Sequence, residues 1–378
     1  MGRPSARGAT IPERRVVPGP VVDVCAGPGG IDMGARILGL PGMTGVELDA
    51  DAVATGRAAG FTRVHADMRE LAPARHRGIT GFIGTPPCPG FSPAGKHLGR
   101  NDMQTILDAI TCYGSGCGGC EWTDLAERTQ DFRSKLVVEC ARWVLTAPDL
   151  EWFLCEQVPA VEPIWEDLTA EAYAAGWEYV DVMKLSATDF GLPSKRVRTF
   201  VYGRRYDSPQ VHPHDAGWNG KDLPRHTMAS VLGFPPGVQV ITRGDRKTSG
   251  GNAFSADGPS WCLTGSTRSW KLRFPDGTER ELTAAEAGLL NGFPIDYPWQ
   301  GSRTKQFLQS ADVVNPVIAA VALGCATNTP WVEPVRAYLE QLYGPGTAPT
   351  KPVVTLPPMR RQHTDQTDLL AELAGAAA

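Results

Sequence analysis

The stretch Val21-Val22-Asp23-Val24-Cys25-Ala26-Gly27-Pro28-Gly29-Gly30 decides the fold. Its first half is a short apolar run, which is typical of a buried strand, and its second half is a glycine-rich turn. Apolar residues then follow at positions 31, 33, 35 and 38, which indicates a helix. The order strand, glycine turn, helix predicts the first unit of an α/β sheet, with the ordered chain beginning near Val16.

The same plan recurs along the chain. Residues 43–48 predict a second strand, and residues 51–59 predict an alanine-rich helix. Further strands are predicted at 81–83, 152–155 and 199–202, and further helices at 134–145, 163–175, 283–291 and 313–323. Strands that alternate with helices predict a doubly wound, mostly parallel α/β sheet, whose ligands bind at the carboxyl ends of the strands.

The composition changes after Arg205. Pro, Gly, Trp and basic residues dominate there, and helical periodicity is lost until Thr283. We therefore expect four parts: a disordered arm at 1–15, a catalytic domain at 16–205 completed by 305–343, a smaller second domain at 206–304, and a disordered tail at 344–378.

The formal net charge of −4 does not by itself indicate a nucleic-acid partner, but the distribution of charge does. Residues 195–280 hold 14 Lys or Arg against 7 Asp or Glu, which predicts a basic face. The nine cysteines are an odd number, and no apolar run approaches the roughly 20 residues that span a bilayer. We expect a cytoplasmic protein with free thiols, no secretory signal and no membrane span.

The sharpest local feature is Gly84-Thr85-Pro86-Pro87-Cys88-Pro89-Gly90-Phe91-Ser92, directly after the strand at 81–83. Prolines on both sides of the cysteine stiffen the backbone and remove hydrogen-bond donors, so the turn presents the thiol at the carboxyl edge of the sheet. A free cysteine is most often a small buried hydrophobic residue. This setting instead favours Cys88 as a nucleophile.

A set of short motifs spread over residues 20–325 resembles, in order, the motifs of DNA (cytosine-5) methyltransferases. They are residues 23–30, Glu47 with Asp49, Asp67, Pro86-Pro87-Cys88, Glu156-Gln157-Val158, Arg196 with Arg198, and residues 282–294. The resemblance implies a Rossmann-like fold that depends on S-adenosylmethionine, with a smaller target-recognition domain. It also implies a monomer that acts on duplex DNA, and a restriction endonuclease is a candidate partner.

The resemblance assigns catalytic roles to four residues. Cys88 adds to carbon 6 of cytosine and makes carbon 5 nucleophilic, while Glu156 stabilises the adduct at ring nitrogen 3. Arg196 and Arg198 hold the cytosine carbonyl oxygen and either a phosphate or the cysteine turn. Gln157 stands where the family usually has Asn.

The resemblance also implies a site for S-adenosylmethionine. The glycine turn approaches the methionine part, Glu47 binds the ribose hydroxyls, and Asp67 binds the adenine amino group. Two candidates depart from the family pattern, since Cys25 replaces Phe and Asp312 replaces Asn. The cofactor-binding candidates are Cys25, Ala26, Gly27, Pro28, Gly29, Gly30, Glu47, Leu48, Asp67, Met68, Pro86 and Asp312.

A cytosine in duplex DNA must leave the base stack before a thiol can reach carbon 6, so a loop has to close over it. Residues 91–100 hold glycines, a serine and a lysine that suit a mobile lid. The candidates for contacts to DNA are Ser92, Lys96, Arg243, Arg246, Lys247, Arg268, Lys271 and Arg273.

Three alternatives stay open at this point. Cys112, Cys117 and Cys120 form C-x4-C-x2-C, and with Cys140 as a fourth ligand they are candidates for zinc, although we expect no metal. The departures at Cys25 and Asp312 leave open a catalytically weak or inactive DNA-binding relative. The same chemistry on tRNA cytosine is the third alternative.

Overall fold

The computed structural model describes residues 19–87, 90–91, 101–116, 128–131, 133–206, 223–242 and 253–344. The predicted arm at 1–15 lies outside the described residues, and so does the predicted tail after Gly344. Among the described residues, no single helix is long and apolar enough to cross a membrane, and one pair of helices bent by 42° meets that test only by length and composition.

The chain forms eleven named strands in the described part. They are β1 (Val21–Val24), β2 (Thr44–Glu47), β3 (Thr62–His65), β4 (Gly81–Gly84), β5 (Trp152–Gln157), β6 (Tyr179–Ser186), β7 (Val197–Arg204), β8 (Gln239–Ile241), β9 (Ala253–Ser255), β10 (Lys271–Arg273) and β11 (Glu279–Glu281). The α-helices there are α1 (Gly30–Ile37), α2 (Ala50–Ala58), α4 (Met103–Gly114), α6 (Leu136–Thr146), α7 (Glu162–Ala174), α8 (Met228–Leu232), α9 (Ala284–Leu290), α10 (Arg303–Asp312), α11 (Pro316–Thr327) and α12 (Val332–Tyr343). The short 3-10 helices are η1 (Met68–Glu70), η2 (Pro73–Arg75), η3 (Pro159–Val161), η4 (Ala187–Phe190) and η5 (Gly265–Ser269).

Seven strands form one large sheet in the order β3-β2-β1-β4-β5-β7-β6. All neighbours are parallel except β7, which runs antiparallel to both β5 and β6. The strand order reverses between β1 and β4, where the chain crosses from one half of the sheet to the other. The predicted doubly wound, mostly parallel sheet is therefore confirmed, and its ligand site is expected at this reversal.

The register brings the carboxyl ends of the central strands to one edge. Val24, the last residue of β1, pairs with Gly84, the last residue of β4. Glu47 ends β2, and Glu156 lies one residue before the end of β5. Both carboxylates thus belong to the edge at which the glycine turn begins.

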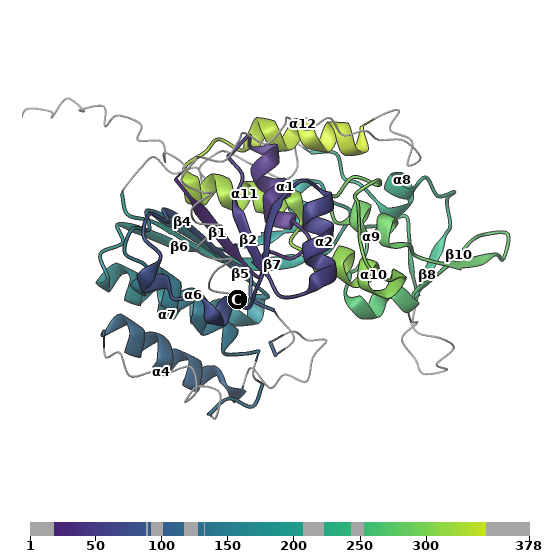
Figure 1. Cartoon of the computed structure of the whole chain (residues 1–378). Helices are drawn as coiled ribbons and strands as arrows, with labels where there is room; N and C mark the ends of the chain where they lie inside the picture. Colours follow the sequence, from purple (N-terminus) through teal and green to yellow (C-terminus); the bar gives the residue numbers. More distant parts are fainter. Residues whose placement is uncertain are drawn as a thin grey trace, which may run out of the picture.

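Helices cover both faces of this sheet, as Figure 1 shows. Helices α1, α11 and α12 pack on one face around one apolar core, and α4, α6 and α7 pack on the other around a second core. Helix α11 is buried along its whole length and contacts α1, β5 and β7. The apolar helix predicted at 313–323 therefore does return to the first part of the chain.

A second sheet, antiparallel and four-stranded, has the order β11-β10-β8-β9. It lies with α8, α9 and α10 beside the large sheet, on the right of Figure 1. Backbone hydrogen bonds join the region to the segment before β7: Ser194 forms an isolated bridge with Ser260, Lys195 donates its backbone N–H to the Ser260 carbonyl oxygen at 2.8 Å, and Ser260 donates its own N–H to the Pro193 carbonyl oxygen at 2.8 Å. These contacts come directly before Arg196, one of the two candidate arginines.

Candidate active site

The turn after β1 requires glycine at two positions. Gly27 and Gly29 have positive φ angles of 55° and 115°, and a side chain at Gly29 would come within 2.8 Å of the Tyr297 hydroxyl. That hydroxyl donates a 2.5 Å hydrogen bond to the Pro28 carbonyl oxygen. Cys25 also has a positive φ, of 58°, which is uncommon for a residue with a side chain. The turn is thus held in one shape by a tyrosine from a distant part of the chain.

Glu47 holds the same turn from the neighbouring strand. Its Oε2 accepts the backbone N–H of Gly27 at 2.8 Å, and its Oε1 accepts the backbone N–H of Asp49 at 2.7 Å. Each carboxylate oxygen can accept a second hydrogen bond, so these contacts leave capacity for a ligand. Leu48 follows with 60% of its surface exposed, which is unusual for a leucine beside a site.

Asp67 lies directly before η1 and is already engaged. Its carboxylate accepts the Arg69 backbone N–H at 2.9 Å and forms a two-pronged ion pair with the Arg69 guanidinium. The next residue, Met68, is buried, and its sulfur lies 3.2 Å from the Cys25 thiol. Burial raises the pKa of Cys25 well above its ordinary value, so this thiol is a neutral packing group.

Asp23 in β1 was assigned no individual role by sequence reasoning. It is fully buried, and neither carboxylate oxygen has a hydrogen-bond partner among the described residues. Burial raises the pKa of Asp23 well above its ordinary value, Asp32 raises it further, and Arg63 opposes both. The available signal was an acid inside an otherwise apolar strand, because a buried carboxylate calls for a cationic or hydrogen-bonding partner.

Glu156 and Arg198 form an ion pair at the end of β5. The Arg198 Nε lies 2.9 Å from the Glu156 Oε1, and both side chains are largely buried. Burial raises the pKa of the Glu156 carboxyl group, while Arg198 and then Arg196 act to lower it. A carboxyl group with a raised pKa can hold a proton near neutral pH and donate it.

Arg196 has a different environment from Arg198. Its guanidinium donates to the backbone carbonyl oxygens of Ala311 at 3.0 Å, Asp312 at 2.7 Å and, more weakly, Leu263 at 3.4 Å. It is buried, and burial lowers its pKa. The structure therefore separates the two arginines: Arg198 lies at the acid, and Arg196 joins β7 to the end of α10 and to the segment before η5.

The segment after β4 is fixed from two neighbouring strands. Gln157, fully buried in β5, donates its Nε2 to the Pro86 carbonyl oxygen at 2.9 Å and accepts the Val158 backbone N–H at 2.8 Å. From the side of β1, the Val24 carbonyl oxygen accepts the Thr85 backbone N–H at 3.2 Å. Thus the glutamine that replaces the family's usual asparagine connects the strand of Glu156 to the first proline of the cysteine turn.

Several candidates lie outside the described residues, and their roles stay predictions. They are Cys88, Ser92, Lys96, Arg243, Arg246 and Lys247.

Asp312 closes α10 next to the arginines. Its carboxylate accepts a hydrogen bond from the Gly265 backbone N–H, and its backbone carbonyl oxygen is held by Arg196. Part of the Asp312 side chain is exposed to solvent. The surrounding protein nevertheless removes water from the carboxyl group and raises its pKa, while the positive charges of Arg196 and Arg198 lower that pKa. In this structure Asp312 thus contacts the second region of the chain rather than the glycine turn.

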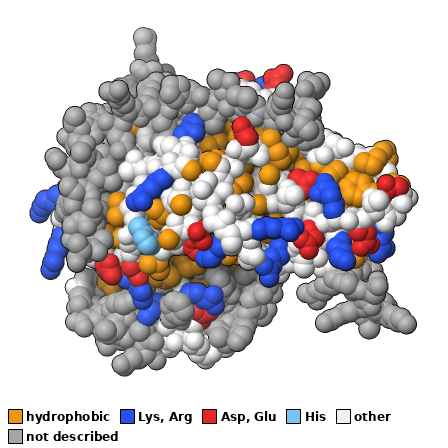
Figure 2. All heavy atoms as spheres, turned by 45° about the vertical axis from the view of Figure 1, so that its right-hand side comes forward, with side chains coloured by type: hydrophobic (Ala, Val, Ile, Leu, Met, Phe, Trp, Pro, Cys, Tyr) orange, Lys and Arg blue, Asp and Glu red, His pale blue; other side chains and the backbone are white. Residues whose placement is uncertain are grey.

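The described basic residues of the second sheet are mostly paired. Arg273 and Lys271 lie 2.7 and 3.7 Å from Glu279, and Arg268 donates to the Thr304 hydroxyl at 2.8 Å. Figure 2 shows blue and red side chains interleaved on this side of the molecule rather than one continuous basic patch. Around β10 and β11 the basic residues are thus paired with glutamates, and a continuous basic face over 195–280 stays a prediction.

The cysteine candidates form no metal site among the described residues. Cys112 on α4 is disulfide-bonded, so the expectation of free thiols throughout is wrong at this position. A disulfide-bonded cysteine offers no thiolate to a metal ion. Burial raises the pKa of Cys140 well above its ordinary value, whereas zinc binds the thiolate. Cys117 and Cys120 lie outside the described residues.

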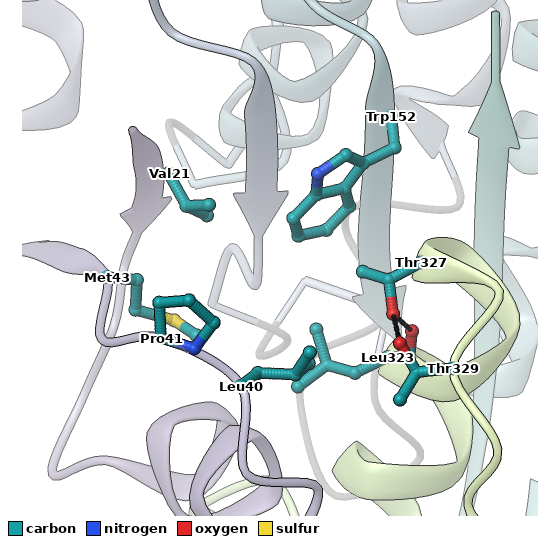
Figure 3. A pocket seen from close by; sticks show the side chains of 8 residues that line it. All are labelled: Val21, Leu40, Pro41, Met43, Trp152, Leu323, Thr327 and Thr329. Atoms are coloured by element: carbon teal, nitrogen blue, oxygen red, sulfur yellow. Dashed lines mark hydrogen bonds between the residues drawn. The ribbon is translucent and has the colours of Figure 1, made fainter. Parts of the chain in front are cut away.

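A small apolar pocket lies at the opposite, amino-terminal edge of the large sheet. Figure 3 shows Val21, Leu40, Pro41, Met43, Trp152, Leu323, Thr327 and Thr329 around it. Thr327 and Thr329 bond each other at 2.8 Å, so most of the lining offers no polar group to a ligand. The pocket is therefore separate from the cluster of Glu47, Glu156 and Arg198.

Residues 20–111, which contain the glycine turn, Glu47, Asp67 and the cysteine turn, match the family described as C-5 cytosine-specific DNA methylase. The Type II methyltransferase M.AplI of Arthrospira platensis is 25% identical over 79% of this chain and 83% of its own length. Residues 20–111 thus carry a cytosine-5 DNA methylase domain, and type II methyltransferases match 79% of the chain. A second relative, the Type II methyltransferase M.NaeI of Lentzea aerocolonigenes, is 41% identical over 23% of this chain and 22% of its own length.

Solved structures give the cytosine-5 methyltransferase the same fold. The S. pombe Dnmt2 methyltransferase superposes with a TM-score of 0.57 at 15% identity, over 80% of this chain and 98% of that one. A putative DNA modification methyltransferase encoded within an E. coli prophage gives 0.51 at 20% identity, over 82% and 98%. The predicted methyltransferase fold is thereby confirmed, and the enzyme class follows from the family: methyl transfer to carbon 5 of cytosine in DNA.

Proposed function

We propose that this enzyme takes its methyl group from S-adenosylmethionine and transfers it to a cytosine turned out of duplex DNA, through a covalent adduct with Cys88. The observation that carries the proposal is the buried ion pair of Glu156 and Arg198, joined through Gln157 to Pro86, two residues before the cysteine. An acid with a raised pKa beside a stiff cysteine turn supplies both groups that addition to a pyrimidine needs.

The chemistry divides between these residues. The Cys88 thiolate adds to carbon 6, and the electron pair of the 5,6 double bond moves toward ring nitrogen 3, where the proton of Glu156 stabilises it. Carbon 5 can then take the methyl group. Transfer of the carbon 5 proton to water, departure of the thiolate from carbon 6 and return of the ring nitrogen 3 proton to Glu156 restore the aromatic ring. Arg198 orients Glu156 and can donate to the cytosine carbonyl oxygen.

The residues around the glycine turn suit S-adenosylmethionine. Asp23 offers a buried carboxylate without a partner, which matches the ammonium group of the methionine part. Glu47 keeps acceptor capacity for ribose hydroxyls, and exposed Leu48 offers apolar surface to a ring. Asp67 is engaged by Arg69, so its proposed contact to the adenine amino group requires that ion pair to open. When bound, the sulfonium supplies an electrophilic methyl group.

We also propose the division into a catalytic domain at 16–205 with 305–343 and a target-recognition domain at 206–304. The placement of β8 to β11 in a sheet of their own, between residues 239 and 281, supports it. The type II relatives support a paired restriction endonuclease as a further part of the proposal, and we also propose a cytoplasmic monomer.

The test is covalent trapping on 5-fluorocytosine, because fluorine at carbon 5 blocks the final elimination. The unmodified protein, Cys88→Ala and, as a matched control, Cys262→Ala are each incubated with S-adenosylmethionine and fluorinated duplex DNA. We expect a denaturation-resistant complex with the unmodified protein and with Cys262→Ala, and none with Cys88→Ala. A complex with Cys88→Ala would refute the role of Cys88, and trapping only on fluorinated tRNA would move the substrate from DNA to RNA.

A further inference from the structure

A buried arginine lies directly behind the glycine turn. Arg63 of β3 and its partner Asp32 of α1 have side chains with no exposed surface. Two glycines make room for the arginine: a Cβ at Gly45 would collide with its guanidinium, and a Cβ at Gly56 would lie 2.7 Å from its Nε. The surrounding strands and helices are thus shaped around this one side chain.

The guanidinium of Arg63 reaches three groups. Its two terminal nitrogens bind both carboxylate oxygens of Asp32, with the Nη1–Oδ1 distance at 3.2 Å. Its Nη1 also donates to the Thr62 carbonyl oxygen at 3.0 Å, and its Nε donates to the Gly27 carbonyl oxygen at 3.3 Å. Since Glu47 accepts the Gly27 N–H at 2.8 Å, both polar groups of this glycine are held.

A buried ion pair is weak evidence for a gain in stability, because the cost of removing two charges from water offsets their attraction. Apolar residues of similar volume would pack in the same space without that cost. What they would lack is a donor for the Gly27 carbonyl oxygen and a positive charge near Asp23, whose pKa burial raises and Arg63 lowers. The hydrogen bond fixes the glycine turn, and the positive charge favours the ionised form of Asp23 in the strand that leads into that turn.

We propose that Arg63 is a positioning residue that holds the glycine turn in the shape that binds S-adenosylmethionine, and that Asp32 serves by fixing Arg63. This inference rests on the proposed cofactor. It predicts that the turn is preformed in the free protein, so that little ordering is needed when the cofactor binds.

The test separates positioning from stability with a double variant. Arg63→Met alone leaves Asp32 buried and unpaired, so it should lower both the thermal midpoint and the affinity for S-adenosylmethionine. Arg63→Met with Asp32→Leu should recover most of the thermal midpoint, yet its dissociation constant, measured by calorimetry, should stay raised by about tenfold or more. Amide exchange at residues 25–31 should be faster than in the unmodified protein without any cofactor present.

Arg204→Met is the matched control, since Arg204 is also buried but lies at the end of β7, opposite the first residue of β5 and away from the glycine turn. It should lower the thermal midpoint without changing cofactor affinity. Arg63→Lys keeps the charge and, if the double variant does not fold, carries the same test. A folded double or lysine variant that binds as tightly as the unmodified protein overturns the inference, whereas an unmodified protein that does not bind S-adenosylmethionine overturns the proposed function instead.

Discussion

Burial and two arginines act in opposite directions on the carboxyl group of Glu156, and burial is the larger effect. Because the proposed mechanism uses the protonated form, kcat/KM should fall as pH rises through the pKa of Glu156, which lies above its ordinary value of 4.5. In Glu156→Gln this fall should be absent and the maximum should be lower by about a hundredfold. Methylation rates across pH on a duplex substrate measure both, and a variant that keeps the same fall at high pH would contradict the assignment.

The same shift affects stability, and its sign follows from proton binding. The folded protein holds the Glu156 proton more tightly than the unfolded chain, so this contribution to the free energy of unfolding is complete below the unfolded pKa and is lost as pH rises through the folded pKa. As pH rises from the unfolded pKa through the folded pKa of Glu156, the unmodified protein should therefore lose unfolding free energy relative to Glu156→Gln. Urea unfolding measures it, with the exposed Glu333→Gln as a control that should show no such trend.

Gln157 carries a second prediction at this scale. Gln157→Leu leaves the Pro86 carbonyl oxygen and the Val158 N–H without their partner in a buried place, which costs about 1–3 kcal/mol of unfolding free energy. The larger effect should be on trapping at Cys88, because the turn loses its link to β5. Gln157→Asn restores the family's usual residue and should retain part of both properties. Equal trapping rates in all three proteins would show that the link does not position the cysteine.

Sequence reasoning singled out Glu47 and Glu156 because each sits in a recognisable motif at the end of a strand, and the two arginines because they form a motif at the start of β7; their roles stay predictions. It could not identify Arg63 or separate Arg196 from Arg198. Those roles depend on what lies opposite a side chain in three dimensions: Arg63 meets a carboxylate 31 residues away, and Arg196 meets carbonyl groups 115 and 116 residues away. A sequence motif also could not show that the Asp67 carboxylate is paired with Arg69.

At the scale of elements, the predicted strands were the more apolar ones of the large sheet, whereas helix α4 was not predicted although Ile106, Ala109 and Ile110 are buried in it. Strands β3 and β6 were not predicted because polar residues interrupt them, as Thr62, Arg63 and His65 do in β3. Helix α10 was not predicted for the same reason, since it begins with charged and polar residues and exposes much of its surface. Such elements are specified by their neighbours: β3 by its pairing with β2, and α10 by its packing on α9.

The contact of α1 with α11 reverses the usual effect of one substitution. Replacing glycine by alanine inside a helix normally stabilises by up to about 1 kcal/mol. At Gly34, however, the added Cβ would lie 2.6 Å from the Ala319 Cβ and 2.7 Å from the Ala320 backbone nitrogen. Gly34→Ala should therefore destabilise by about 1–3 kcal/mol in chemical unfolding. In Gly258→Ala the added Cβ would lie 4.0 Å from the Ser255 carbonyl oxygen, so this control should change stability little. A stabilised Gly34→Ala would show that the two helices can separate at low cost.

At the scale of the whole molecule, the described arginines and lysines around β10 and β11 are paired with glutamates rather than gathered in one basic patch. Where basic residues are paired in this way, contacts of another kind can add to DNA binding. Apolar and aromatic groups that stay exposed beside the site are the available ones.

Trp261 is the clearest of these. Trp261 is 42% exposed, and its indole stacks on the ring of Phe254 in the edge strand β9, with 4.7 Å between the ring centroids. The preceding residue, Ser260, forms a β-bridge with Ser194, which lies two residues before Arg196. A rigid indole at this position can contact a base or a sugar beside the extruded cytosine, and such contacts contribute about 1–3 kcal/mol each.

Trp261→Ala should therefore weaken binding to a duplex containing the target by about fivefold or more, while the affinity for S-adenosylmethionine stays the same. Trp261→Phe should recover part of the loss because it keeps a ring on Phe254. Tyr173→Ala removes an aromatic side chain of similar exposure, 48%, from α7 on the far side of the large sheet, and it should leave DNA binding unchanged. If Trp261→Ala binds DNA as tightly as Tyr173→Ala at several salt concentrations, Trp261 is not part of the recognition surface, and the sequence-specific contacts come from other residues.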